Sequence, residues 1–235
     1  MTIREGLEKH PNWRTSAAPH YALQLVKAVE FLHEHEVIHA DLKCENVLVN
    51  SRGRIQLADF GSAIRFRKES QQQHEEGRSK SCILGGTVDY ASPEVLQGTP
   101  VSELGIAVDL WSLGCIMGAF QWGESPFHAA SDALALDSIM NYANGAATPP
   151  LLESQELELL SEGWKELIVG LLHPKPSKRL GAVAQSSSIC DSVPGHQMID
   201  LIMDPPFLPP EPKWIGESRN SAMIDGKQGW SSFLL

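Results

Sequence analysis

Apolar residues recur at helical spacing between residues 16 and 34, which predicts one amphipathic helix. Ser16 is suited to the N-cap position of this helix, and Pro19 is tolerated in the first turn. The apolar positions that define its buried face are Tyr21, Leu25, Val29 and Leu32.

Two short runs rich in β-branched and aliphatic residues follow, VLVN at residues 47–50 and RIQLAD at residues 54–59. The residues between them are the turn formers Asn50, Ser51, Arg52 and Gly53. This pattern predicts a small β hairpin.

The segment GIAVDLWSLGCIMGAF, residues 105–120, is apolar on nearly all sides, which is typical of a helix buried within a domain. Its Asp109 is costly to bury and therefore needs a partner. Residues 131–141, with Ser131 as a cap, and residues 163–172 predict two further helices. The predicted fold is mostly helical, with one small hairpin.

Other segments carry no such pattern. Residues 67–81 contain no apolar residue, and we expect them to form a loop. From Pro205 onward many turn formers and little periodicity predict a linker. The sequence contains no internal repeat and no glycine-rich phosphate loop of the G-x-x-x-x-G-K or G-x-G-x-x-G type.

Composition limits the classes of function. A chain of 235 residues with 42% hydrophobic residues can bury a sizeable core. The net charge of -10 argues against nucleic acid as the main partner. No apolar run reaches the length of a membrane span, and the charged first residues do not resemble a signal peptide. The four separated cysteines indicate free thiols in a reducing compartment, so we expect a cytoplasmic protein.

The candidate chemistry lies in VIHADLKCENVLVN, residues 37–50, which contains Asp41, Lys43 and Asn46. Phosphoryl transfer from a nucleotide needs oxygen ligands for magnesium, a carboxylate that orients the attacking hydroxyl, and a cation near the phosphate. His39 completes the pattern H-x-D-x-K-x-x-N, which average residue usage produces in roughly one chain in a thousand. The D-F-G sequence that starts at Asp59 is much weaker by itself.

Four motifs in order resemble the C-terminal lobe of a eukaryotic protein kinase. They are VIHADLKCENVLV, LADFGSA, GGTVDYASPEVL and VDLWSLGCI. PSKRLG resembles the segment whose arginine, here Arg179, pairs with the glutamate of the P-E motif, here Glu94. Lys43 favours the serine/threonine class. Within that class the sequence resembles the AGC group, and phosphoinositide-dependent protein kinases most.

The resemblance implies ATP and Mg²⁺ as cofactors and proteins as substrates. It implies that Asp41 orients the substrate hydroxyl and accepts its proton, and that Lys43 contacts the γ-phosphate. Asn46 and Asp59 would hold magnesium. The other implied residues near the nucleotide or the substrate are Glu45, Leu48 under adenine, and Thr87 in the substrate loop. The residues with implied structural roles are His39, Phe60, Gly61, Glu94, Asp109 and Arg179. The partner of Asp109 would be the backbone of the loop that contains Asp41.

The resemblance covers residues 1–207, which we expect to form a protein-kinase-like α+β domain with a mainly helical C-terminal lobe. Residues 208–235 would be a linker or tail that leads to a further domain. The N-terminal lobe is expected to be absent from the chain, so phosphate transfer by the chain alone would be slow or lacking. Ala40 replaces an arginine that usually binds the phosphorylated activation segment, so activation by phosphorylation in this usual way is not expected. Cys44 replaces a common proline, and a redox-sensing thiol is an alternative to a purely structural role.

Two other functions fit parts of the pattern. The chain could be a pseudokinase or regulatory fragment that serves as a protein-binding module. A small-molecule kinase of the aminoglycoside or choline type shares H-x-D-x-x-x-x-N, but it lacks the P-E and D-x-W-x-x-G elements that stand here.

Overall fold

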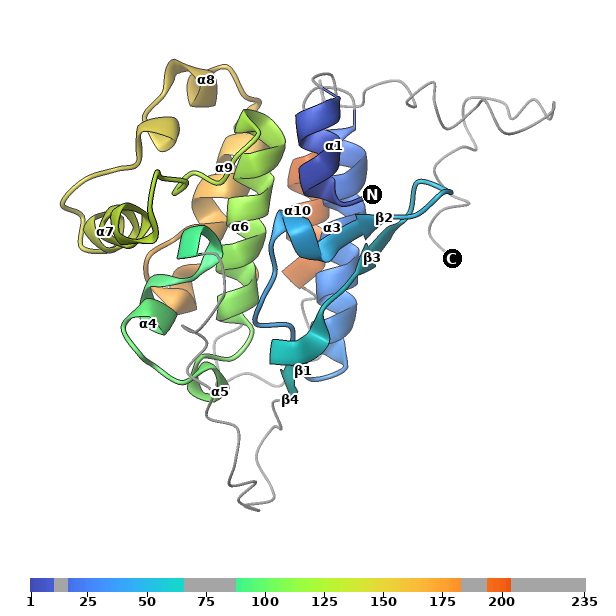
Figure 1. Ribbon diagram of the computed structural model, residues 1–235, viewed down its shortest axis with the longest axis horizontal. Helices are drawn as coiled ribbons and strands as arrows, with labels where there is room; N and C mark the ends of the chain where they lie inside the picture. The colour runs from blue at the N-terminus through green and yellow to red at the C-terminus, as the bar shows by residue number, and fades with distance from the viewer. Residues whose placement is uncertain (11–16, 66–87, 183–193, 204–235) are drawn as a thin grey trace, which may run out of the picture.

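The computed structural model describes residues 1–10, 17–65, 88–182 and 194–203, and it is mainly helical, with two small antiparallel sheets (Figure 1). The α-helices are α1 (Ile3–Lys9), α3 (Ala18–Glu34), α4 (Pro93–Leu96), α5 (Val101–Leu104), α6 (Ala107–Trp122), α7 (Asp132–Ala143), α8 (Gln155–Glu158), α9 (Glu162–Leu171) and α10 (Pro194–Met203). The strands are β1 (Val37–Ile38), β2 (Val47–Val49), β3 (Ile55–Leu57) and β4 (Ile64–Arg65). The 3₁₀ turns are η1 (Cys44–Asn46), η2 (Phe60–Ser62), η3 (Val88–Tyr90), η4 (Pro150–Leu152) and η5 (Pro176–Lys178).

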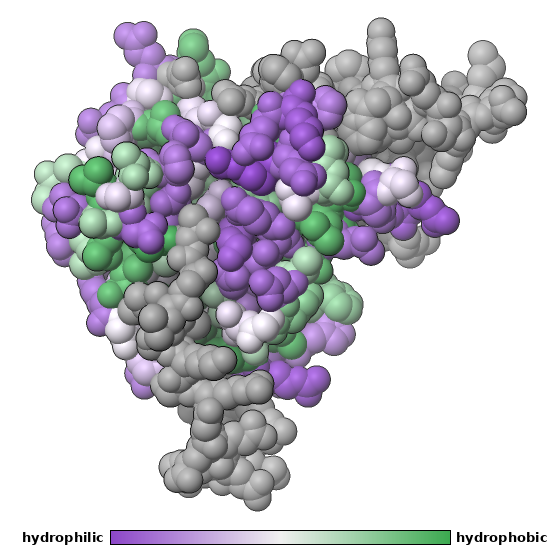
Figure 2. Space-filling model, in the orientation of Figure 1, coloured by the Kyte–Doolittle hydropathy of each residue, from purple (hydrophilic) through white to green (hydrophobic). Residues whose placement is uncertain are grey.

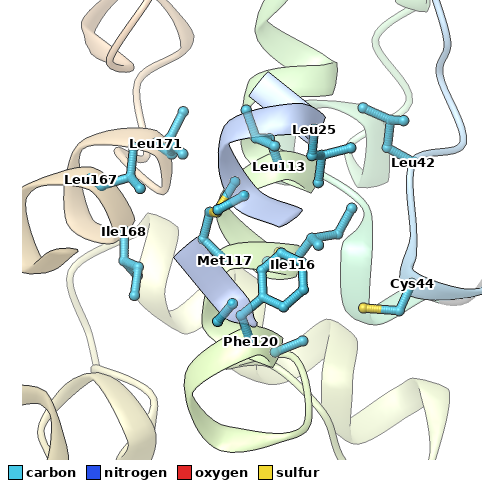
Figure 3. Close-up of a cluster of buried hydrophobic side chains, with 14 of the residues drawn as sticks. Leu25, Leu42, Cys44, Leu113, Ile116, Met117, Phe120, Leu167, Ile168 and Leu171 are labelled. Atoms are coloured by element: carbon cyan, nitrogen blue, oxygen red, sulfur yellow. The ribbon is translucent and has the colours of Figure 1, made fainter. Parts of the chain in front are cut away.

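Helix α6 runs through the middle of the molecule, between α9 and α3 (Figure 1). Its side chains are buried all round, which confirms the prediction from its apolar sequence. Leu113 and Met117 of this helix lie in the cluster of buried side chains that Figure 3 shows, together with Leu25 of α3 and Ile168 of α9. The core is therefore built around a single helix.

Helix α3 is present, but its predicted N-terminus is wrong. The helix begins at Ala18, and its N-cap is Ala17, which makes no side-chain capping bond. Ser16 is therefore not the cap, and it lies outside the described residues. The predicted buried face is confirmed at Tyr21, Leu25 and Val29. Burial of this apolar face stabilises the helix although its N-terminus has no side-chain cap.

The predicted hairpin is confirmed. Strands β2 and β3 pair with Val47 opposite Leu57 and Val49 opposite Ile55. In the turn, the Asn50 side-chain oxygen accepts hydrogen bonds from the backbone N–H groups of Arg52 and Arg54. A second sheet, β1 with β4, was not predicted. Its strands are two residues long, with 25 residues between them along the chain. Such short strands show no alternation of apolar and polar residues from which a strand could be predicted.

The predicted helices at residues 131–141 and 163–172 are confirmed as α7 and α9. The Ser131 hydroxyl accepts a hydrogen bond from Leu134 N–H, as an N-cap should. Figure 2 shows hydrophobic atoms on the surface over α7, where Leu134 is 54% and Leu136 38% exposed. The predictions for residues 67–81 and from Pro205 onward lie outside the described residues.

Among residues 1–10, 17–65, 88–182 and 194–203, no helix has the length and apolar character that crossing a membrane requires.

Candidate active site

Asp109 of α6 anchors the loop 39–46. One of its carboxylate oxygens accepts hydrogen bonds from His39 N–H at 2.8 Å and from the His33 ring at 2.9 Å. The other oxygen accepts from Ala40 N–H at 2.9 Å. Asp109 is fully buried, so these three donors replace the water that its carboxylate loses. The predicted contact with the loop backbone is present, whereas the contact with His33 was not predicted.

Ala40 adopts a left-handed backbone conformation, with φ of 61°. A non-glycine residue pays about 1–2 kcal/mol for this conformation. The hydrogen bond from Ala40 N–H to Asp109 holds the residue there. The strained turn directs the chain from strand β1 into Asp41, and the side chain at residue 40 is a methyl group.

The His39 ring connects the loop to the segment that follows β3. Its Nε2 lies 3.0 Å from the Ala58 carbonyl oxygen, and its Nδ1 lies 3.4 Å from Asp41 N. A carbonyl only accepts and a backbone N–H only donates, so a ring with its proton on Nε2 satisfies both contacts. The ring also packs against Phe60 with centroids 4.8 Å apart. His39 thereby holds Asp41 and the D-F-G segment at Asp59 together.

Asp41, Lys43 and Asn46 form one hydrogen-bonded cluster. Lys43 Nζ donates to both carboxylate oxygens of Asp41, at 2.8 and 3.1 Å. Asn46 Nδ2 donates to the Asp41 carboxylate at 3.0 Å and to the Asp41 carbonyl at 2.8 Å. The Asp41 and Lys43 side chains are 24% and 15% exposed, so the cluster is open to a ligand. Residues that lie within six positions of one another in the sequence therefore converge in space as well.

Asp59 follows strand β3, at the same open end of the hairpin as Asn46. Its backbone is left-handed, with φ of 60°, and its carboxylate accepts a hydrogen bond from Gly61 N–H at 3.3 Å. A Cβ atom at Gly61 would lie 3.1 Å from that same oxygen, which explains the glycine. Ala58 N–H donates to the Asn46 carbonyl at 2.9 Å. The hairpin therefore brings Asp59 next to Asn46, although Asp59 is 13 positions further along the sequence.

Asn46 and Asp59 carry oxygen atoms of the kind that Mg²⁺ prefers. Within the described part of the chain, no group of three or more His, Cys, Asp or Glu residues is arranged to hold a metal. Within the described residues both hydrogen bonds of the Asn46 side chain use Nδ2, which leaves its Oδ1 without a donor, and Asp59 is exposed. Mg²⁺ is usually bound by one or two such protein ligands together with phosphate and water.

Two further predicted site residues lie in the segment that contains this cluster and continues into β2. Leu48 is half-buried in β2, and Glu45 is exposed in η1. Thr87 lies outside the described residues.

Cys44 is fully buried, and Figure 3 shows its sulfur directed toward the core. Burial raises the pKa of this thiol to about 12. Because only the thiolate is reactive, the structure argues against the redox-sensing alternative and for a packing role.

Arg179 and Glu94 form the predicted pair, and the arginine is saturated with partners. Its two terminal nitrogens donate to the two oxygens of Glu94, the NH2 contact being 2.7 Å long. Its other donors reach the carbonyl oxygens of Ala107, His173 and Pro174. All five guanidinium N–H groups thus have acceptors, in an environment where both side chains are buried.

A second polar junction was missed in the sequence. Asp89 of η3 contacts the His128 ring through its carboxylate at 2.6 Å, and its carbonyl accepts from the Ser125 hydroxyl at 2.7 Å. The two segments are more than 30 residues apart, and although Asp89 lies within the motif GGTVDYASPEVL, no pattern linked it to Ser125 or His128. The junction fixes η3, the described segment that follows Thr87.

Comparison with known proteins agrees with this geometry. Residues 2–189 match the protein kinase domain family. The chain is 33% identical over 199 residues to 3-phosphoinositide-dependent protein kinase 1 of Arabidopsis thaliana, an alignment that covers 82% of the chain and 38% of the plant protein. It is 37% identical over 134 residues to serine/threonine-protein kinase PDK1 of Cryptococcus neoformans, covering 57% of the chain and 10% of the fungal protein. The chain thus matches less than two fifths of the length of either relative.

The family match spans the loop 39–46, the D-F-G segment, the P-E glutamate and α6. It favours a protein kinase over the small-molecule kinases that share only part of this pattern. The chain therefore belongs to the protein kinase family, as a serine/threonine kinase domain of the AGC type that is similar to 3-phosphoinositide-dependent protein kinases.

Proposed function

We propose that this protein transfers the γ-phosphate of ATP to serine or threonine hydroxyls of protein substrates. The observation that carries the proposal is the cluster of Asp41, Lys43 and Asn46, with Asp59 delivered beside it by the hairpin. Protein kinase domains in general use ATP, usually with magnesium. The cluster offers the carboxylate, the cation and the oxygen ligands that this reaction requires.

Asp41 is the residue that we propose to receive the substrate hydroxyl. Its Oδ2 already accepts from Lys43 and Asn46, whereas its Oδ1 accepts only from Lys43, at 3.1 Å. Oδ1 therefore has capacity to orient a hydroxyl and to accept its proton as the phosphorus–oxygen bond forms. The two bonds to Oδ2 fix the rotation of the carboxylate, so the accepting oxygen is held in place.

Lys43 would place its ammonium group beside the transferred phosphate, while its bonds to Asp41 keep it at the site. Asn46 Oδ1 and the Asp59 carboxylate would hold magnesium, which when bound neutralises charge on the β- and γ-phosphates. Leu48 in β2 would contact the adenine ring, and Glu45 lies at the exposed rim of the same loop. Thr87 would belong to the substrate loop.

The proposal assigns residues 1–207 to the kinase domain and residues 208–235 to a linker or tail. The family match ends at residue 189, but α10 (Pro194–Met203) packs against α3 and α9. Its contacts favour a domain that continues beyond the matched segment. The proposal also includes a cytoplasmic location, which the free thiols of Cys44 and Cys115 favour.

The proposal is tested by phosphate transfer from radiolabelled ATP to peptide libraries that contain serine or threonine. Residues 1–235 contain no glycine-rich phosphate loop. Transfer should therefore be measured with the chain itself and with the product of the longest transcript that contains it. Activity that disappears in Asp41→Asn and persists in Asp137→Asn, an exposed site on α7, supports the enzyme. If neither the chain nor the product of the longest transcript transfers phosphate, a protein-binding module is favoured instead.

A further inference from the structure

The side chain of Gln24 connects helix α3 to the hairpin. Its Oε1 accepts a hydrogen bond from Ile55 N–H at 3.0 Å, and its Nε2 donates to the Gly53 carbonyl at 3.2 Å. The contacts span 29 and 31 positions of sequence. Gln24 is half-buried between the helix and the strand, where water competes less for these bonds. Figure 1 shows the hairpin running alongside α3.

The two contacts replace a neighbouring strand. Strand β3 has one ladder partner, β2, so its other edge presents free backbone groups. The primary amide of Gln24 supplies one acceptor and one donor to groups two residues apart on that edge, as a paired peptide would. The amide thereby fixes the position of the start of β3 relative to α3.

The opposite end of the same hairpin carries the proposed magnesium ligands. Asn46 directly precedes β2, and Asp59 follows β3 after Ala58. Ile55 is three residues from Ala58, which pairs with Asn46, and four residues from Asp59, so the Gln24 contact lies about 10–13 Å from these ligands along the paired strands. The far end is joined to the loop 39–46 by the His39 contact with Ala58, by Ala58 N–H, which donates to the Asn46 carbonyl, and by the Asn46 side chain, which donates to Asp41.

We propose that Gln24 is a positioning residue, which sets the placement of Asn46 and Asp59 for metal and nucleotide by fixing the hairpin to α3. This inference rests on the proposed function, since it assumes that these two residues hold magnesium. Gln24 itself contacts neither ligand. Its effect is transmitted by the hairpin backbone.

The experiment measures the affinity of Mn²⁺ for the full chain in the presence of ADP, by electron paramagnetic resonance of free Mn²⁺. Gln24→Met removes, at similar side-chain size, the hydrogen bonds to Ile55 and Gly53 and also the 2.8 Å contact of Nε2 with the His20 ring on α3. Gln24→Glu keeps the acceptor for Ile55 N–H while losing the donor to Gly53. Gln56→Met is the matched control, because Gln56 is exposed on the same strand. Asn46→Ala is the positive control for loss of the metal.

We expect Gln24→Met to weaken Mn²⁺ binding about tenfold, the lower end of the range for residues that orient metal ligands. Gln24→Glu should lie between Gln24→Met and the wild type, and Gln56→Met should match the wild type. Hydrogen exchange at Ile55 N–H should accelerate in Gln24→Met and remain slow in Gln56→Met.

Unchanged Mn²⁺ affinity in Gln24→Met, alongside weakened binding in Asn46→Ala, would overturn the positioning role and leave the proposed function intact. If Gln24→Met lowers the thermal stability but leaves the Mn²⁺ affinity unchanged, the positioning role is also overturned, since Gln24 then has a purely structural role. If Gln24→Met does not fold, Gln24→Glu decides by the same criterion. If the wild type shows no Mn²⁺ binding that depends on Asn46, the proposed function fails, and the inference fails with it.

Discussion

Arg179 and Glu94 join two segments 85 residues apart through two parallel hydrogen bonds, with the guanidinium 5.0 Å from the centre of the Trp111 ring. Removal of one partner leaves the other charge buried and unpaired. We expect Arg179→Met to lower the free energy of unfolding by about 3–5 kcal/mol, measured by urea denaturation.

Lys165 of α9 provides the control for this change, because its two carboxylate partners are exposed to solvent. Lys165 lies within 3.1 Å of Glu158 and Glu162, whose side chains are 75% and 87% exposed. Lys165→Met should change the free energy of unfolding by less than about 1 kcal/mol. Similar losses for the two variants would contradict the role that we assign to burial.

Asp109 is the next test, because its carboxylate accepts from both His39 N–H and Ala40 N–H. In Asp109→Asn one oxygen becomes a donor, so at least one of these N–H groups is left without an acceptor. The expected cost is about 1–3 kcal/mol of unfolding free energy. Amide hydrogen exchange should accelerate at residues 39 and 40, and unchanged exchange there would show that the loop is held by other contacts.

Asp41 should separate activity from stability. Its side chain is partly exposed, so solvent screens part of its ion pair with Lys43. Asp41→Asn should therefore change the free energy of unfolding by about 1 kcal/mol or less. It should lower the phosphate-transfer rate of an active form by a factor of about 10²–10⁴, as expected for loss of a general base. A variant that unfolds would point to a structural role.

Stability should fall as the pH rises above about 9. Burial raises the pKa of the Cys44 thiol to about 12, and it also raises the pKa of Cys115. An unfolded thiol loses its proton near pH 8.5, while the folded one keeps it. The folded state therefore binds more protons, and the free energy of unfolding decreases by up to about 1.4 kcal/mol per pH unit and thiol between the two pKa values.

Urea denaturation from pH 7 to pH 10.5 measures this dependence. Cys44→Ala should reduce the slope above pH 9, although it lowers stability at pH 7 through the lost packing. An unchanged slope would assign the effect to other buried groups, such as Tyr90, whose pKa is also raised by burial.

Gly114 lets α6 approach α9. A Cβ atom at this position would lie 2.8 Å from the Leu172 side chain. Glycine to alanine within a helix normally stabilises by about 0.5–1 kcal/mol. Here we expect Gly114→Ala to destabilise by about 1–3 kcal/mol, because the added methyl group overpacks the core. A gain in melting temperature would contradict this close contact.

The local sequence determined much of the fold. The apolar positions predicted α3, α7 and α9, because burial of one face repeats every 3.6 residues. The uniformly apolar segment predicted the buried α6, and turn formers between two short runs predicted the hairpin. The spacing of Asp41, Lys43 and Asn46 predicted the candidate site, since residues within six positions of one another can reach each other in one loop.

The tertiary structure decided the contacts that join distant positions. Nothing in the sequence indicated that His33 shares Asp109 with the loop, that Asp89 meets His128, or that Gln24 holds the hairpin. Strands β1 and β4 were missed for the same reason, as two-residue strands have no period. Hydrogen bonds between residues dozens of positions apart depend on where helices and turns place their ends. That placement results from packing around α6 rather than from any local pattern.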